Sequence, residues 1–317
     1  MKKILITRKL ILPSEKYASK IFNAKLNKED ILLSKEELIK ESSDCDGILS
    51  SLTEKIDSDV ISKLSSKVKI ISNFAVGFGN IDIIAARKRN IIVTNTPDVL
   101  TDATAEIAIL ILLGAARRAK EGMEMANKKN WKWSADFLMG KQLTGARLGI
   151  LGMGRIGRAV ADKARSFGMI IHYHNRSQLD KNLEKDAVYH NSLESLFSVS
   201  DFFSINCPAT KETKHIINKE TLKYFPDGAV LSNSARGDMI DDDAMAASLK
   251  SGKIFSLGLD VYNGEPNIHP EYLKLPNVFV LPHLGSSTVK TRTAMGNLAV
   301  SNLEEFFKSG KCKNTVN

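Results

Sequence analysis

Cysteine is scarce in this chain of 317 residues. The three cysteines, Cys45, Cys207 and Cys312, are odd in number and far apart in the sequence. This spacing excludes a disulfide framework and gives no zinc-binding pattern, so we expect no metal site built on cysteine. The scarcity favours a protein of a reducing compartment, and we expect a cytoplasmic location.

Long hydrophobic runs are absent as well. The apolar run near the amino terminus is too short for a signal peptide. The longest apolar stretch, residues 105–116, contains Glu106 and falls well short of the roughly 20 residues that span a bilayer. We therefore expect a buried helix at this stretch and no association with a membrane.

The chain also lacks an arginine tract and a basic patch interleaved with aromatic residues, although its net charge is +9. Lysines scattered over surface helices are typical of a solvated basic surface, so we expect no nucleic-acid partner. The length of the chain exceeds that of one typical domain and favours two.

Short apolar runs and helical patterns alternate along both halves of the chain. In the first half the expected strands are 3–7, 47–49, 69–72 and 91–94, and the expected helices are 14–22, 34–40, 57–64 and 82–88. In the second half the expected strands are 147–151, 169–173, 201–205, 229–233, 256–260 and 278–281, and the expected helices are 155–167, 193–197, 219–225, 241–251 and 287–308. This alternation predicts an α/β fold with two doubly wound parallel sheets.

The two halves are joined by a breaker at residues 96–98 and a helix at 102–118 that is apolar nearly all round and must be buried. An irregular segment, residues 130–140, then carries Trp131, Trp133 and Phe137. Aromatic residues in such a segment pack a core or a domain seam, or else form a subunit interface, where tryptophan is enriched.

A glycine motif lies between the strand at 147–151 and the helix at 155–167. Gly152, Gly154 and Gly157 form G-x-G-x-x-G. The first glycine permits a tight turn, the second lets the backbone approach a pyrophosphate, and the third lets the helix pack on the strand. The free N–H groups of the helix terminus favour phosphate binding. The motif and its flanking elements predict a dinucleotide site.

The end of the next strand indicates which dinucleotide is bound. An NAD site usually places an acidic residue about 20 residues after the glycines, on the ribose 2′-hydroxyl. Here Asn175, Arg176 and Ser177 occupy that place. Two hydrogen-bond donors and a guanidinium suit a 2′-phosphate, so we expect NADP(H) to be preferred over NAD(H). The alternative is that Arg176 is a solvated loop cation and NAD still binds.

Three polar residues follow expected strand ends in the second half, where α/β sheets place their ligands. They are Arg236, Glu265 and His283. Taken singly, Arg236 is explained as a helix-flanking cation, Glu265 as a turn carboxylate and His283 as a loop histidine. Together, after a dinucleotide motif, they indicate a catalytic site. His172 and His174 share one face of a strand, but no third ligand is placed with them, so an ordinary strand surface is favoured over a metal site.

The chain resembles the D-2-hydroxyacid dehydrogenase family, especially its glyoxylate/hydroxypyruvate reductase branch. The matching segments span most of the chain: residues 75–82, 102–106, 152–157, 206–208, 233–237, 260–266 and 282–287. The resemblance implies a discontinuous, flavodoxin-like substrate-binding domain (1–97 and 287–317) and an inserted Rossmann NAD(P)-binding domain (98–286).

The resemblance also implies roles for individual residues. Arg236 would hold the carboxylate of a 2-oxoacid with help from the N–H groups of Val76 and Gly77. His283 would donate a proton to the carbonyl oxygen, while Glu265 would orient the ring and favour its protonated form. The remaining positions implied to bind the cofactor are Thr104, Arg155, Ile156, Cys207, Pro208 and Asp260.

The activity implied is NADPH-dependent reduction of glyoxylate to glycolate, of hydroxypyruvate to D-glycerate, or of both, by a cytoplasmic homodimer. A tryptophan of the partner subunit would reach the active site, and the spacing does not choose between Trp131 and Trp133. Two alternatives remain. One is an NAD-linked dehydrogenase for a bulkier or phosphorylated 2-oxoacid, and the other is a nucleotide-sensing, corepressor-like binding protein without activity.

Overall fold

The computed structural model describes residues 1–129 and 131–317, and the chain divides into two compact units. The first unit comprises Met1–Leu100 and Ser286–Asn317, and the second comprises Thr101–Gly285. The chain thus leaves the first unit and returns to it. Assignment of substrate binding to residues 1–97 and 287–317, and of coenzyme binding to 98–286, stays a prediction.

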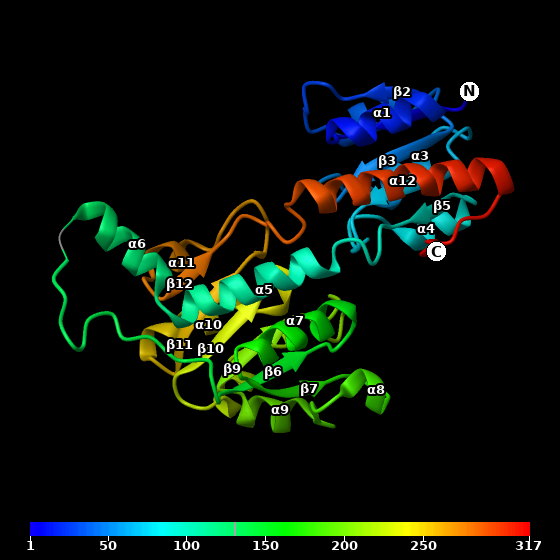
Figure 1. Cartoon of the computed structure of the whole chain (residues 1–317). Coiled ribbons are helices and arrows are strands. Elements are labelled where there is room, and N and C mark those ends of the chain that lie inside the picture. Colours follow the sequence, from blue (N-terminus) through cyan, green and yellow to red (C-terminus); the bar gives the residue numbers. More distant parts are fainter. Residues whose placement is uncertain (130) are drawn as a thin grey trace. The chain divides into compact units, whose positions relative to one another are not determined.

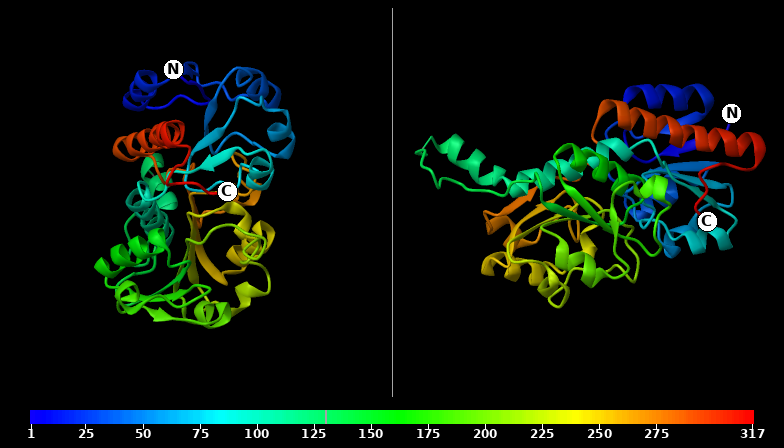
Figure 2. Two further views of the ribbon diagram at one scale, coloured as in Figure 1. Left: turned by 90° about the vertical axis from the view of Figure 1, so that its right-hand side faces the viewer. Right: turned by 60° about the horizontal axis from the view of Figure 1, so that its bottom comes forward.

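The first unit is a five-stranded parallel sheet in the order β2-β1-β3-β4-β5, the flavodoxin-like order. Its strands are β1 (Lys3–Ile6), β2 (Asn23–Leu26), β3 (Gly47–Ser51), β4 (Ile70–Phe74) and β5 (Ile92–Thr94). Its helices are α1 (Leu12–Ile21), α2 (Lys35–Glu41), α3 (Ser58–Lys63), α4 (Ile83–Lys88) and α12 (Val289–Ser309). Helices α1 and α12 lie side by side over one face, and α2, α3 and α4 cover the other (Figures 1 and 2).

The second unit is a seven-stranded parallel sheet in the order β12-β11-β10-β9-β6-β7-β8, which contains the Rossmann order. Its strands are β6 (Arg147–Leu151), β7 (Ile170–His174), β8 (Val188–Tyr189), β9 (Phe202–Ile205), β10 (Ala229–Asn233), β11 (Ile254–Leu259) and β12 (Val278–Val280). Helices α5 (Thr101–Ala116) and α7 (Arg155–Ser166) pack on one face of this sheet, and α9 (Leu193–Val199) and α10 (Asp242–Ser251) pack on the other (Figure 1).

The predicted fold class is therefore confirmed. The order of β9, β6 and β7 creates a switch point beside β6, because the chain moves outward from this strand in both directions. In doubly wound sheets the ligand crevice opens at the carboxyl ends of the strands at such a point. The glycine motif follows β6 directly.

Some elements differ from the predictions. The expected helix at 219–225 is only a 3₁₀ turn, Thr221–Tyr224, because Asn218 and Thr221 use their side chains to cap each other's backbone and Pro226 follows. Five short elements of the second unit were not predicted: α6 (Ala119–Lys128), α8 (Lys181–Glu184), β8, the 3₁₀ turn η2 (Gly237–Met239) and α11 (Pro270–Lys274). Strand β2 was also missed, because its residues are only half buried at a sheet edge and form no apolar run.

The tryptophan segment does not pack in a core. Trp131 and Trp133 are 53% and 80% exposed, and Trp131 stacks on Phe137, with ring centroids 6.2 Å apart. Of the alternatives that the sequence left open, packing in a core is contradicted for both tryptophans, because residues 131–140 form no helix or strand that could bury them. The alternative of a subunit interface stays a prediction. Asn130, where the segment begins, lies outside the described residues. Helix α6, just before it, extends away from the sheet of the second unit (Figure 2).

Among residues 1–129 and 131–317, no helix combines the length and the hydrophobicity that crossing a membrane requires.

Candidate active site

The glycine turn has the geometry that a pyrophosphate needs. Gly152 has a φ of +93°, and a Cβ there would lie 2.5 Å from the backbone nitrogen of Cys207. A Cβ at Gly157 would lie 2.1 Å from the carbonyl oxygen of Gly152, so only glycine lets α7 approach β6 this closely. At Gly154, by contrast, nothing lies within 4 Å of a Cβ. The turn is thus tight within the protein and open at the helix terminus, which fits a dinucleotide.

The first turn of α7 carries positive rather than negative side chains. Arg155 begins the helix, Arg158 follows, and the first turn contains no acidic residue. This is the reverse of what the helix dipole favours for a terminus facing water, and it suits a terminus that binds an anion. Ile156, between the two arginines, packs against the core beneath α7.

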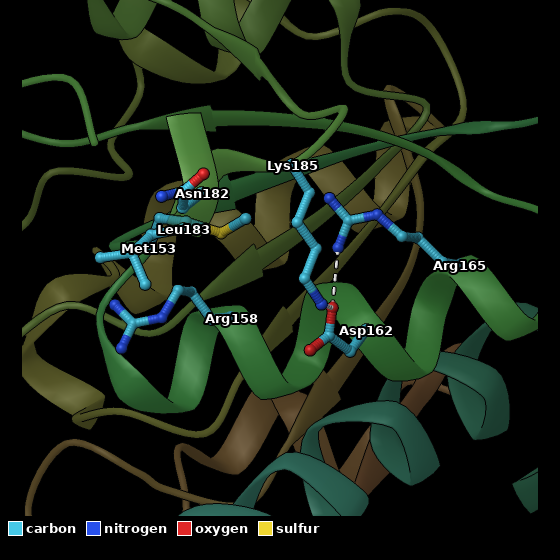
Figure 3. A pocket seen from close by; sticks show the side chains of 7 residues that line it. All are labelled: Met153, Arg158, Asp162, Arg165, Asn182, Leu183 and Lys185. Atoms are coloured by element: carbon cyan, nitrogen blue, oxygen red, sulfur yellow. Dashed lines mark hydrogen bonds and ion pairs between the residues drawn. The ribbon is translucent and has the colours of Figure 1, made fainter. Parts of the chain in front are cut away.

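A small cavity of about 90 Å³ adjoins this turn (Figure 3). It is lined by Met153, Arg158, Asp162, Arg165, Asn182, Leu183 and Lys185. Arg165 and Lys185 both donate to Oδ1 of Asp162, at 3.0 Å and 2.5 Å, and Arg158 lies toward Met153. Three cations against one carboxylate line the cavity, so positive charge gathers beside the glycine turn.

The loop after β7 is anchored to that turn. The backbone N–H of Met153 donates to Oδ1 of Asn175 at 2.7 Å, which leaves the amide nitrogen of Asn175 to donate elsewhere. Arg176 and Ser177 are exposed. Behind them the hydroxyl of Tyr173 donates to Glu184 at 2.7 Å and accepts from the N–H of Leu179 at 3.0 Å. The loop is therefore held in place while Arg176 and Ser177 face solvent.

Cys207 and Pro208 follow β9 at the same edge of the sheet. Burial raises the pKa of Cys207 to about 12, so its side chain is a neutral thiol that forms part of the wall. Among the described residues, no charged group lowers the pKa of this thiol, so it is not activated as a nucleophile.

Thr104 and Asp260 hold the segment that carries His283. Thr104 donates to the carbonyl oxygen of Gly285 at 3.1 Å. The buried carboxylate of Asp260 accepts from the N–H groups of Leu284 and Gly285, at 2.7 Å and 2.9 Å. Burial raises the pKa of Asp260, and these two N–H groups oppose that rise. Sequence reasoning missed this bracing role. The signal available was the acidic residue at the end of the apolar strand β11.

Arg236 leaves the end of β10 half buried. One nitrogen of its guanidinium, Nη1, donates to the carbonyl oxygen of Ala235 at 2.6 Å. Within the described part of the chain, no carboxylate or carbonyl is bonded to its other nitrogens. Burial lowers the pKa of Arg236, and the charges of Glu265 and Asp238 counter this effect. A desolvated cation with free donors is suited to a two-pronged bond with a carboxylate.

Glu265 and His283 form a direct pair. Nδ1 of His283 lies 2.7 Å from Oε2 of Glu265, and the two side chains are 28% and 29% exposed. Burial raises the pKa of Glu265, but the hydrogen bond and charge of His283, the N–H of Tyr262 and the charge of Arg236 outweigh it. The net pKa lies below the ordinary value, so Glu265 is ionised near neutral pH.

The structure thus brings Arg236, Glu265 and His283 together in the second unit. Val76 and Gly77 lie in the first unit, just after β4, where their carbonyl oxygens accept from Asn95 and Asn73 at 2.8 Å and 3.0 Å. Their N–H groups are not used by these bonds. Their contact with a substrate stays a prediction.

The histidines of β7 interact with a third histidine that sequence reasoning did not connect to them. Nδ1 of His172 lies 2.9 Å from Nε2 of His190, and Nδ1 of His174 lies 2.8 Å from the carbonyl oxygen of His190. Desolvation lowers the pKa of both His172 and His190. Within the described ranges, no three His, Cys, Asp or Glu side chains are grouped to hold a metal ion.

Comparison with known proteins places this chain in one family. Residues 109–285 match the model of the D-isomer specific 2-hydroxyacid dehydrogenase NAD-binding domain. Over 310 residues, 96% of this chain and 96% of the relative, the sequence is 40% identical to the glycerate dehydrogenase of Hyphomicrobium methylovorum. The chain belongs to the D-isomer specific 2-hydroxyacid dehydrogenases. The resemblance seen in the sequence is confirmed.

Two further relatives of the present chain are described as reductases of glyoxylate or of glyoxylate and hydroxypyruvate. The enzyme of Thermococcus litoralis is 38% identical over 320 residues, which cover 99% of this chain and 96% of that one. The structure of the NADPH-dependent glyoxylate/hydroxypyruvate reductase of Sinorhizobium meliloti, in complex with NADP and malonate, aligns with a TM-score of 0.88. It is 30% identical and the match covers 99% of this chain and 96% of that one. The protein is therefore an oxidoreductase with an NAD(P)-binding domain.

Proposed function

We propose that this dehydrogenase reduces a small 2-oxoacid, glyoxylate or hydroxypyruvate, with NADPH, and that His283 is the proton donor. The observation that carries the proposal is the pair formed by His283 and an ionised Glu265 next to a half-buried Arg236. Glycerate dehydrogenase and glyoxylate reductases among the relatives support this substrate class.

Arg236 binds the substrate carboxylate in this scheme. Its uncommitted guanidinium nitrogens offer parallel donors to the two carboxylate oxygens, and its partial burial strengthens the ion pair. The N–H groups of Val76 and Gly77 donate to the same carboxylate. A carboxylate held at both oxygens leaves the adjacent carbonyl carbon in a defined orientation.

The proton comes from Nε2 of His283. Nδ1 is bonded to Glu265, so Nε2 is the ring nitrogen that remains to face the carbonyl oxygen. The negative charge of Glu265 stabilises the cationic ring that must donate. When bound, the coenzyme would supply the hydride that the carbonyl carbon accepts. The carbonyl oxygen takes the proton from Nε2 and becomes the hydroxyl of a 2-hydroxyacid.

The preference for NADPH rests on the loop after β7. Arg176 and Ser177 are exposed at its tip, no carboxylate lies among residues 174–179, and a cationic cavity adjoins the glycine turn. This charge favours a 2′-phosphate over a 2′-hydroxyl. The pyrophosphate would lie at Gly154, Arg155 and Ile156, with Thr104, Cys207, Pro208 and Asp260 along the remainder of the coenzyme.

We extend the proposal to a homodimer. Trp131 and Trp133 are large apolar side chains that the protein leaves exposed, which is typical of residues that a partner covers. Sedimentation equilibrium of the wild-type protein and of the Trp131→Ala and Trp133→Ala variants tests this point. A monomeric wild-type protein at assay concentration would overturn it.

Steady-state reduction of glyoxylate and hydroxypyruvate with NADPH and with NADH tests the function. We expect turnover of at least one of the two oxoacids, preference for NADPH, and a loss of about a thousandfold in kcat for His283→Gln. The Arg236→Gln variant should raise the KM for the oxoacid and lower kcat. A clear preference for NADH or for bulky oxoacids would favour the NAD-linked alternative. Activity unchanged in both variants would favour a nucleotide-binding protein without catalysis.

A further inference from the structure

The side chain of Tyr262 has no role in the site described so far, yet Tyr262 contacts the supports of all three catalytic candidates. It lies three residues after the end of β11, between Asp260 and Glu265. Its ring is half buried against the hydrophobic core of the second unit. Its backbone N–H donates to Oε1 of Glu265 at 3.0 Å. This bond occupies the carboxylate oxygen that His283 does not use.

The side chain of Tyr262 contacts the segment that carries His283, the other member of the pair. Its hydroxyl donates to the carbonyl oxygen of Leu281, two residues before His283. The same carbonyl oxygen accepts from the backbone N–H of His283 at 3.1 Å. The hydroxyl therefore bonds the same carbonyl group that accepts from the backbone of His283.

His283 needs such support. Its φ is 55°, in the left-handed region that a residue with a side chain adopts only when its surroundings hold it there. The carbonyl oxygen of Asp260 accepts from its N–H at 2.9 Å, which supplies one restraint. The hydroxyl of Tyr262 supplies another, from a rigid aromatic side chain.

The backbone of Tyr262 also meets the neighbour of Arg236. A Cβ at Gly237 would lie 1.9 Å from the carbonyl carbon of Tyr262, so the two backbones are in direct contact. One residue thus touches the chain beside Arg236, the carboxylate of Glu265 and the turn that carries His283. Burial raises the pKa of Tyr262, and the charges of Asp260 and Glu265 raise it further. The hydroxyl is therefore protonated near neutral pH and can donate a hydrogen bond.

We propose that Tyr262 is a positioning residue of the active site, whose hydroxyl holds the turn before His283 so that Nε2 of His283 faces the substrate carbonyl. The inference rests on the proposed role of His283 as proton donor. It adds that the hydroxyl of Tyr262 sets the orientation of His283 without itself binding substrate or coenzyme.

The Tyr262→Phe variant tests this proposal, because it removes the hydroxyl and keeps the ring in the core. We expect kcat for oxoacid reduction to fall about tenfold, with the Kd for NADPH unchanged, since a small displacement of a reacting group costs rate rather than binding. Tyr272→Phe is the matched control. Tyr272 is also a buried tyrosine, and its hydroxyl bonds Asp242 at 2.9 Å, so its loss should affect Tm and leave kcat unchanged.

A double variant separates positioning from a general structural effect. In a His283→Gln background the hydroxyl has no donor to position, so adding Tyr262→Phe should not lower the residual kcat further. An equal fall in both backgrounds, or wild-type kcat in Tyr262→Phe, would overturn the inference. Full activity of His283→Gln alone would overturn the proposed function itself. Failure of the inference on Tyr262 and failure of the proposed function would therefore appear in different variants.

Discussion

Nδ1 of His283 and Oε2 of Glu265 lie 2.7 Å apart, although the two residues are 18 positions apart in the chain. The two segments meet because β11 and β12 are neighbouring parallel strands, whose carboxyl ends lie at one edge of the sheet. The pair combines an ionised carboxylate with a ring whose Nε2 is not engaged by Glu265 and is proposed to face the substrate. Its charge and orientation can be tested separately.

The Glu265→Gln variant removes the charge and keeps a hydrogen-bond acceptor for Nδ1. We expect kcat for reduction to fall about tenfold to a hundredfold, because the cationic ring loses its counter-charge while its orientation survives. The measurement is steady-state reduction of glyoxylate by NADPH near pH 7. Glu212→Gln, which removes an exposed carboxylate, is the control and should retain wild-type kcat. An unchanged kcat in Glu265→Gln would remove the carboxylate from the mechanism.

The Arg176→Asp variant places a carboxylate where a 2′-phosphate is proposed to bind. We expect the KM for NADPH to rise at least about tenfold, because like charges repel, while NADH is used as well as before or better. Lys223→Asp makes the same change of charge on an exposed turn and should leave both KM values unchanged. If the ratio of the two coenzymes stays constant in Arg176→Asp, Arg176 does not select NADPH.

Substitution of two glycines of the turn should affect different properties, the stability of the fold in one case and coenzyme affinity in the other. In Gly157→Ala the added methyl group meets the carbonyl oxygen of Gly152, so we expect unfolding free energy to fall by about 1–3 kcal/mol. In Gly154→Ala the methyl group meets no protein atom, so Tm should be retained while coenzyme affinity falls. Thermal melts and titration with NADPH measure the two effects. Equal coenzyme affinity of Gly154→Ala and wild type would show that the coenzyme does not approach this carbon.

The pair formed by Asp201 and Arg147 should make the unfolding free energy of the protein depend on pH. The carboxylate of Asp201 accepts from the backbone N–H of Arg147 at 3.0 Å and from Nε and Nη2 of the same residue at 2.9 Å and 2.8 Å. The bond from the Arg147 side chain is the main reason that the pKa of Asp201 lies below its ordinary value, although burial opposes it. A lowered folded-state pKa contributes stability that is complete above the unfolded value and is lost as pH falls through the folded value.

The Asp201→Asn variant should therefore be less stable by about 1 kcal/mol at pH 7, a small figure because the pair is partly exposed to solvent. The difference from wild type should shrink as the pH falls through the lowered pKa. Urea unfolding at a series of pH values measures this difference. A constant difference at every pH would show that the charge of Asp201 does not stabilise the fold.

Local patterns sufficed for much of this protein. The strands β1, β3, β4 and β6 and the helix α7 were predicted because strand and helix periodicity are properties of adjacent residues. Short elements such as α8 and β8 were missed, because they are stabilised by long-range contacts. Glu184, for example, ends α8 by accepting from Tyr173 on β7. The sequence left the place of the tryptophans open, because composition predicts the size of an apolar side chain but not what covers it.

The sequence by itself determined the alternation of strands and helices, the glycine turn and the identity of the polar residues at strand ends, because each is encoded within a few neighbouring positions. Only the tertiary structure decided which of these residues meet. The contact of Glu265 with His283, the bracing of Leu284 and Gly285 by Asp260, and the bond from Tyr262 to Leu281 all depend on strand order. Strand order is set by the packing of helices on both faces of a sheet, which joins segments far apart in the chain.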